Sequence, residues 1–122
     1  MADASGLAIT LTSTINLIFG SYVMVPETGI IMNNEMNDFS IPSNSSLFGD
    51  RPSKSNYVKL GKRPLSSISP TLVEFAANST FYMALGAAGS SRIITSVVQA
   101  LWYILDRDMN LYDALYEPRF HE

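Results

Sequence analysis

The chain has no cysteine and a single histidine among its 122 residues, and these shortages exclude several kinds of site. A thiolate zinc site, a Cys-His nucleophile pair and a multi-histidine metal site all need residues that are absent. Basic residues are also scarce. Lys and Arg number 8, the formal net charge is −3, and no basic stripe is present, which argues against nucleic-acid binding. Any catalysis must therefore use hydroxyls, carboxylates and backbone dipoles, and we expect neither a metal nor a cofactor.

Long apolar runs are missing too. The most apolar stretch, 93–105, is interrupted by Thr95, Ser96 and Gln99. It is shorter than the roughly 20 apolar residues that a membrane span needs, so it predicts a core helix instead. No cationic region precedes an apolar run after Met1, and the sequence therefore shows no secretory signal there.

Two glycosylation sequons are nevertheless present, at Asn44 and Asn78. Each alone is a weak signal, because such short motifs arise by chance. Their joint presence without a signal suggests that the natural N-terminus lies upstream of Met1.

Four segments have the patterns of strands. Alternating apolar and polar residues over 7–12 predict a strand that runs into Thr14 and Asn16, and 30–32 predicts a short buried strand after a turn at 26–29. The runs 72–75 and 81–85 flank a polar stretch and predict a hairpin with Asn78 exposed at its tip. Between these strands, 40–62 predicts a long surface loop.

Helices are expected in the last third of the chain. An apolar stripe of Ile93, Val97, Leu101, Ile104 and Leu105 predicts a helix over 92–107, with Ser90 or Ser91 as its N-cap. Asn110 is expected to cap a second short helix that Pro118 ends. Strands followed by helices predict an α+β layer arrangement, and we expect 1–122 to be part of one domain.

The segment Pro64–Pro70 holds two adjacent serines, Ser66 and Ser67, between prolines. Proline fixes its own φ and keeps the residue before it extended, so the hydroxyls are expected in a stiff, non-helical segment. By composition alone the segment is an ordinary loop. No base lies at a recognisable spacing to make either serine a nucleophile.

Two further clusters are candidates for binding. Glu35 and Asp38 follow a strand and could converge on one cation or act as an acid and base pair. The asparagines around them give no apolar pocket, so we expect no raised carboxyl pKa and favour cation binding; solvated surface charge is the alternative. The turn 86–89 follows a strand and opens a helix, a geometry that presents backbone N–H groups to an anion, although close packing alone would also explain it.

The remaining polar residues have plain structural interpretations. Thr12, Ser13, Thr14 and Asn16 have β propensity or form turns. The single His121 is expected to be structural or without contacts, and no Ser-His-Asp arrangement should be built from it.

Taken together, five blocks in this order resemble the small subunit of gamma-glutamyltransferases, also called gamma-glutamyl transpeptidases or glutathione hydrolases. The blocks are 12–20, 29–40, 64–67, 86–89 and 117–121, and they extend over nearly the whole chain. The resemblance implies the αββα sandwich of N-terminal-nucleophile hydrolases. It also implies a precursor that cleaves itself, so that a new N-terminal threonine becomes the nucleophile and its own amine the base.

Residue roles follow from the resemblance. Thr14 matches the threonine that orients the nucleophile, and Asn16, Glu35 and Asp38 match the groups that hold the donor's α-ammonium. Ser66 and Ser67 match the pair that holds the α-carboxylate, beside a large-subunit arginine, and Gly89 and Ser90 match the oxyanion hole.

The chain departs from the family pattern in two ways. Ser90 replaces the usual second glycine, which keeps the N–H but restricts φ. The nucleophilic threonine would lie about five residues before Met1, and the family's strands after 117–121 are missing, so we expect a fragment that is truncated at both ends and inactive alone.

The expected function of the intact enzyme is to cleave the γ-glutamyl amide of glutathione and to transfer the γ-glutamyl group to water, amino acids or dipeptides. The alternative is a non-catalytic relative that binds γ-glutamyl compounds or a partner subunit. The expected partners are the substrate and a large subunit from the same precursor, which would also provide any membrane anchor. The sequons and the family favour a secretory, vacuolar or cell-surface location.

Overall fold

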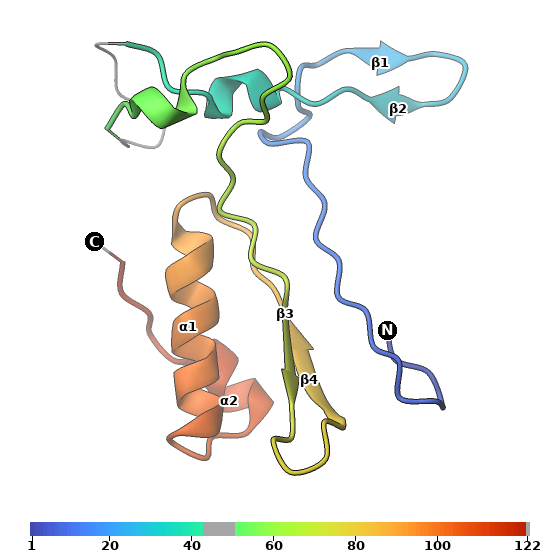
Figure 1. The fold of residues 1–122 in the computed structure, drawn as a ribbon, viewed down its shortest axis with the longest axis vertical. Helices are drawn as coiled ribbons and strands as arrows, with labels where there is room; N and C mark the ends of the chain where they lie inside the picture. The colour runs from blue at the N-terminus through green and yellow to red at the C-terminus, as the bar shows by residue number, and fades with distance from the viewer. Residues whose placement is uncertain (43–50, 122) are drawn as a thin grey trace. The chain divides into compact units, whose positions relative to one another are not determined.

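A computed structural model describes residues 1–42 and 51–121, and these form two compact units (Figure 1). The first unit combines Met1–Thr12 with Ser67–Glu122, and the second is Ser13–Ser66. The expectation of a single partial domain over 1–122 stays a prediction, and the sequon at Asn44 lies outside the described residues.

The first unit contains a hairpin followed by two helices (Figure 1). Strand β3, Thr71–Glu74, pairs antiparallel with β4, Phe81–Leu85, and the register places Val73 opposite Met83. Helix α1, Arg92–Leu105, follows after the turn at 86–91, and α2 is Leu111–Tyr116. The predicted hairpin and both predicted helices are confirmed, and α1 ends two residues earlier than expected.

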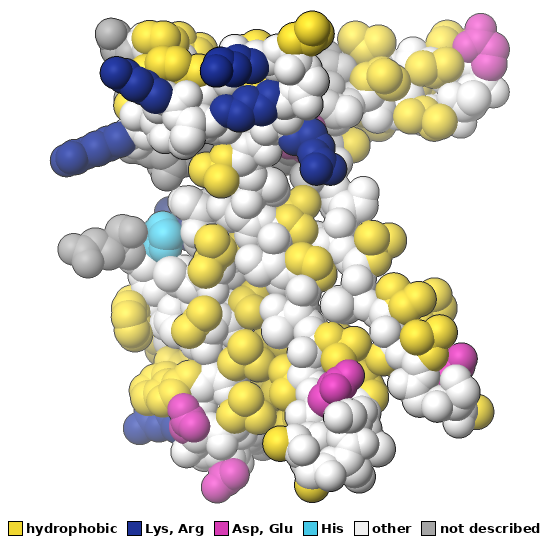
Figure 2. Space-filling view, viewed as in Figure 1, with side chains coloured by type: hydrophobic (Ala, Val, Ile, Leu, Met, Phe, Trp, Pro, Cys, Tyr) yellow, Lys and Arg dark blue, Asp and Glu magenta, His cyan; other side chains and the backbone are white. Residues whose placement is uncertain are grey.

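One side of α1 is buried within the first unit. Its buried residues are Ile93, Val97, Gln99, Ala100 and Tyr103. Leu101 and Ile104 are half-buried, whereas Leu105 is exposed, so the predicted stripe is correct except at its C-terminal end. Apolar side chains also lie on the exposed side of α1, at Ile94, Val98 and Trp102, and Figure 2 shows apolar surface over this part of the unit. In the part of the chain that the structure describes, no helix is long and apolar enough to cross a membrane.

The caps of the two helices differ. Asn110 caps α2 as predicted, because the backbone N–H of Asp113 donates to Asn110 Oδ1 at 3.0 Å. Ser91 occupies the N-cap position of α1 but makes no side-chain capping hydrogen bond. The start of α1 therefore depends on backbone contacts of the preceding turn, in which Arg92 N donates to Gly89 O and Ile93 N to Ser90 O.

The second unit contains short elements only. Strands β1, Met24–Val25, and β2, Ile30–Ile31, form a small antiparallel hairpin around the predicted turn. Two 3-10 helices follow, η1 at Glu35–Asp38 and η2 at Lys54–Asn56. Figure 2 shows Lys and Arg side chains gathered over this unit, which holds five of the chain's eight basic residues: Arg51, Lys54, Lys59, Lys62 and Arg63.

Two expectations about strands are wrong. The described segment 9–15 belongs to no strand: an isolated bridge joins Ala2 to Ala8, and Ile9 exchanges backbone hydrogen bonds with Met1, but no strand ladder forms. Alternation predicts which face of a strand would be buried, but a strand also needs a partner to satisfy its backbone groups. The strand at 30–31 is present but not buried, because Ile30 is 58% exposed.

A glycine allows two segments of the second unit to approach closely. Gly20 is buried with φ +49°, and a side chain there would clash with the carbonyl oxygen of Met32. Ser21 donates to that same oxygen through both its backbone N–H, at 2.9 Å, and its hydroxyl, at 3.0 Å. The loop after Asn16 therefore packs directly against the segment that leads into η1.

Candidate functional site

Asn16 lies at a turn in the left-handed region, with φ +72°. Asparagine adopts this conformation more readily than most residues. Its backbone N–H donates to Thr14 Oγ1 at 2.8 Å, so the Thr14 hydroxyl is fixed beside the turn. Its side-chain Nδ2 donates to the carbonyl oxygen of Asn34 at 3.2 Å, while Oδ1 accepts no hydrogen bond from any described residue. Oδ1 is thus available to a ligand.

Asn34 ties this turn to η1. Its side-chain Oδ1 accepts from the backbone N–H of Leu17 at 3.1 Å, and its own backbone N–H donates to Ile15 O at 3.3 Å. Glu35 is the next residue, and its N–H donates to Asn33 Oδ1 at 3.1 Å. Asn34 therefore connects the turn of Asn16 to the start of η1, where Glu35 lies.

The two carboxyl groups of η1 lie close together. Glu35 and Asp38 are three residues apart in a 3-10 helix, and side chains at this spacing lie on the same side. Glu35 is half-buried, and its Oε1 atom is buried without a hydrogen-bond partner in the described structure. A buried carboxylate oxygen without a donor is costly, and a positively charged group would satisfy it.

Burial raises the pKa of the Glu35 carboxyl above its usual range, and a hydrogen bond and charge repulsion from Asp38 raise it further. The expectation that no carboxyl pKa would be raised is wrong. The neighbours of Glu35 in the sequence are polar, but the fold still removes water from its carboxyl group, and this desolvation raises the pKa. Two close carboxyl groups that are incompletely solvated favour a cation between them. This is a stronger indication of cation binding than the residue types alone gave.

Asn56, which the sequence did not single out, joins η1 to the serine segment within the second unit. Its Nδ2 donates to Asp38 O at 2.7 Å and to Ser40 Oγ at 3.3 Å. Its Oδ1 accepts from the backbone N–H of Leu65, at 2.9 Å, one residue before Ser66. One half-buried side chain thus holds the end of the acidic turn and the start of the serine pair.

The serine pair lies in an irregular segment, as predicted. No described residue from 63 to 70 is helical or in a strand. Ser66 is exposed and Ser67 half-buried, and the carbonyl oxygen of Ser67 accepts from Ser69 Oγ at 2.9 Å. The boundary between the two units falls between these serines, so Ser67 belongs to the first unit.

Gly89 and Ser90 form the turn before α1 in the first unit. Their φ angles are +134° and +59°, so Ser90 adopts the left-handed conformation that its side chain disfavours. The two carbonyl groups accept from the first turn of α1, whereas neither backbone N–H donates to a described residue. Free N–H groups at the start of a helix are of the kind that bind anions, and here Ser90 keeps the left-handed backbone despite its Cβ.

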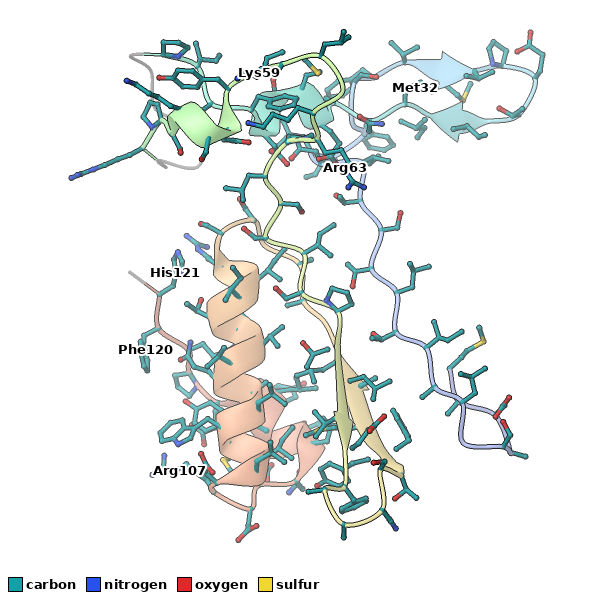
Figure 3. The ribbon with its side chains drawn as sticks, in the orientation of Figure 1. Met32, Lys59, Arg63, Arg107, Phe120 and His121 are labelled. Atoms are coloured by element: carbon teal, nitrogen blue, oxygen red, sulfur yellow. The ribbon has the colours of Figure 1, made fainter. Side chains whose placement is uncertain are left out.

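His121 makes contacts, so of the two expectations for this residue the structural one is confirmed. Its ring shares hydrogen bonds with Thr95 Oγ1 at 3.0 Å and more weakly with Ser91 Oγ at 3.5 Å, and Figure 3 shows it beside α1. Below it, Gln99 pairs with both backbone groups of Phe120, at 3.0 and 2.8 Å. His121 thus fastens the segment after α2 to α1.

Gln99 was treated in the sequence only as an interruption of an apolar run, yet it is the buried polar residue of α1 and is 6% exposed. The Tyr103 hydroxyl also donates to Pro118 O, at 2.8 Å. Gln99 and Tyr103 thus supply hydrogen bonds from α1 to the segment 117–121. The four-residue spacing from Thr95 through Gln99 to Tyr103 is the signal that could have revealed this polar stripe.

A metal centre has no support in the described ranges, where no group of three or more His, Cys, Asp or Glu side chains could hold a metal ion. The arrangement instead offers two carboxyls and an amide oxygen in one unit, and hydroxyl and backbone donors elsewhere. These are groups that bind the charged ends of an amino acid and a developing oxyanion.

A family model described as gamma-glutamyltranspeptidase matches residues 1–122. The chain is 55% identical over 121 residues to the glutathione hydrolase proenzyme of Arthroderma benhamiae, which covers 99% of this chain and 20% of that protein. It is 38% identical over 122 residues to the glutathione hydrolase proenzyme of Escherichia coli, covering 99% and 21%. The chain therefore spans about a fifth of the length of these relatives.

Solved structures agree. The gamma-glutamyltranspeptidase of Pseudomonas nitroreducens complexed with L-DON has a TM-score of 0.92 and 38% identity, and covers 100% of this chain and 63% of that one. A mutant enzyme from Helicobacter pylori has a TM-score of 0.90 and 43% identity, covering 99% and 64%. The predicted fold is confirmed as part of the sandwich of N-terminal-nucleophile hydrolases, with mixed helices and strands. The chain therefore belongs to the gamma-glutamyltranspeptidase family.

Proposed function

We propose that the chain supplies the donor-binding part of an enzyme that cleaves the γ-glutamyl amide of glutathione. The observation that carries the proposal is the carboxyl pair Glu35 and Asp38, with its buried and unpartnered Oε1 atom. An α-ammonium group would satisfy that oxygen and relieve the repulsion between the two carboxylates. Asn16 Oδ1 would accept a further N–H from the same ammonium.

The other end of the donor would be held by neutral hydroxyls. Ser66 and Ser67 would donate to the α-carboxylate, with an arginine from a large subunit of the same precursor completing the grip. Recognition of both α-groups selects a free amino acid end and leaves the group beyond the γ-amide loosely specified. That pattern suits a transferase that releases different leaving groups.

The chemical step would follow the family scheme. An N-terminal threonine of the full-length protein would attack the γ-carbonyl, and the Thr14 hydroxyl would orient its oxygen. The N–H groups of Gly89 and Ser90 would stabilise the tetrahedral oxyanion, since neither donates to a described residue. Collapse would release the amine and leave a γ-glutamyl ester, which water, an amino acid or a dipeptide would then cleave.

The proposal is tested in the full-length protein by replacing one carboxyl. Asp38→Asn removes a charge from the ammonium site and should lower kcat/KM for glutathione roughly 10- to 100-fold, mainly through KM. Glu27→Gln is the matched control, because Glu27 is an exposed acid in the same unit. Equal kcat/KM in Asp38→Asn and the control would refute the donor site. A full-length protein that binds γ-glutamyl compounds but never turns them over would instead identify a non-catalytic relative.

A further inference from the structure

Asn78 lies at the tip of the β3–β4 hairpin, where every residue from 76 to 80 is exposed. The tip is closed by backbone hydrogen bonds from Phe75 N to Thr80 O, at 2.9 Å, and from Ser79 N to Phe75 O, at 2.8 Å. Ser79 takes a positive φ of +54°, which turns the chain sharply. The tip is therefore an ordered turn that projects the sequon into solvent.

The side chain of Asn78 is already arranged by the sequon's own threonine. Asn78 Oδ1 accepts from Thr80 Oγ1 at 2.7 Å and from Thr80 N at 3.1 Å. These bonds fix the amide plane in an Asx turn. The amide nitrogen, Nδ2, donates to no described residue, so the atom that glycosylation modifies is both exposed and unengaged.

The surroundings can accommodate a sugar. Phe75, three residues before Asn78, pairs with Tyr82 across the hairpin at a ring-centroid distance of 4.8 Å. Both rings remain in water, with exposed fractions of 51% and 42%. An exposed aromatic pair offers an apolar face on which the C–H face of a sugar ring can pack. Covering it would remove apolar surface from water at the least protected end of the hairpin.

We propose that Asn78 is N-glycosylated, which places the protein in the secretory pathway. A lipid-pyrophosphate-linked oligosaccharide is the co-reactant. The anomeric carbon of its first sugar forms a bond to Asn78 Nδ2, the bond to the pyrophosphate breaks with its electron pair, and Nδ2 loses a proton. This inference does not rest on the proposed activity, because no residue of the hairpin tip from 76 to 80 is assigned to the donor site or to the oxyanion hole.

The test is to isolate the full-length protein from a fungal secretory host and to measure its mass before and after treatment with peptide N-glycosidase. Thr80→Ala keeps the asparagine but removes the hydroxyl that the sequon needs, and should abolish the modification of Asn78. Thr80→Ser should restore it, since a serine hydroxyl can take the same place. Asn44→Gln is the matched control and should leave the Asn78 glycan intact.

Peptide mapping provides the decisive readout. Enzymatic release converts a glycosylated asparagine to aspartate, so the peptide that contains residue 78 should gain the corresponding mass in the wild type and in Asn44→Gln. The native, folded protein should release the glycan without denaturation, because the tip is exposed. Recovery of unmodified Asn78 from the wild-type secreted protein would overturn the proposal, as would equal modification in Thr80→Ala.

Discussion

The acidic cluster of the second unit and the glycine turn of the first unit are built in different ways. Glu35 and Asp38 act through side chains, and other side chains, above all Asn34 and Asn56, hold their turn in place. Gly89 and Ser90 instead present backbone N–H groups, and β4 and α1 position these. The first site should therefore be sensitive to side-chain identity and the second to backbone conformation. Each prediction below tests one side of that difference.

The largest effect is expected from crowding the close contact between Gly20 and the segment that leads into η1. Gly20→Ala combines a positive φ with a clash against the Met32 carbonyl, and should lower the free energy of unfolding by about 2–5 kcal/mol. Gly29→Ala is the control, because Gly29 also has a positive φ but no atom lies within 4 Å of the added carbon. It should cost only about 1 kcal/mol. Denaturant unfolding measures both, and equal costs would contradict the close approach.

Removing the Asn56 bridge comes next. Asn56→Ala deletes the hydrogen bonds to Asp38, Ser40 and Leu65, and should cost about 1–3 kcal/mol of stability. It should also raise KM for the donor, because it frees the acidic turn from the serine segment. Asn37→Ala changes an exposed asparagine of the same cluster and should stay within about 0.5 kcal/mol of the wild type. A silent Asn56→Ala would show that the bridge has no role.

At the backbone site, removing a side chain should raise the stability of the protein, whereas in the acidic cluster it should lower it. Ser90→Gly relieves the left-handed strain at φ +59° and should stabilise the protein by about 0.5–1 kcal/mol, with catalysis retained. Gly89→Ala introduces strain at φ +134° and should destabilise it and lower kcat. Thermal unfolding and steady-state kinetics measure the two effects. A loss of activity in Ser90→Gly would mean that the serine side chain takes part.

The smallest effect concerns pH. The pKa of Glu35 is raised from 4.5, so the folded state holds this proton more tightly than the unfolded state. Stability is therefore lost as pH rises from the unfolded pKa through the folded one. Glu35→Gln removes this loss, and its stability relative to the wild type should increase as the pH rises above the unfolded-state pKa of 4.5. Unfolding at a series of pH values measures the trend, and a constant difference would contradict the raised pKa.

Elements with their own local signals were predictable. The hairpin β3–β4 follows from two apolar runs around a polar turn, and α2 follows from Asn110 and Pro118. The extended segment 9–15 was predicted as a strand because alternation reports on faces but says nothing about a partner. The end of α1 was misplaced by two residues, within the usual uncertainty of helix boundaries.

The candidate site was predictable as a list of residues but not as an environment. Family motifs marked Glu35 and Asp38, yet the buried Oε1 atom and the raised pKa depend on burial that only the fold produces, together with the position of Asp38 in the same turn. Asn56 has no local signal, since its partners lie 9, 16 and 18 residues away. Gln99 looked like a polar interruption of a core helix because its partner Phe120 is 21 residues away.

The most direct test of the central claim removes the charge from the substrate instead of the protein. Glutathione and an analogue that lacks the α-ammonium group are compared as donors for the full-length wild type and for Asp38→Asn. In the wild type, loss of the ammonium should lower kcat/KM about 100-fold, and in Asp38→Asn the same loss should have a much smaller effect, because the two changes remove one interaction. Equal losses in both proteins would show that Asp38 and the ammonium do not interact, and would contradict the account.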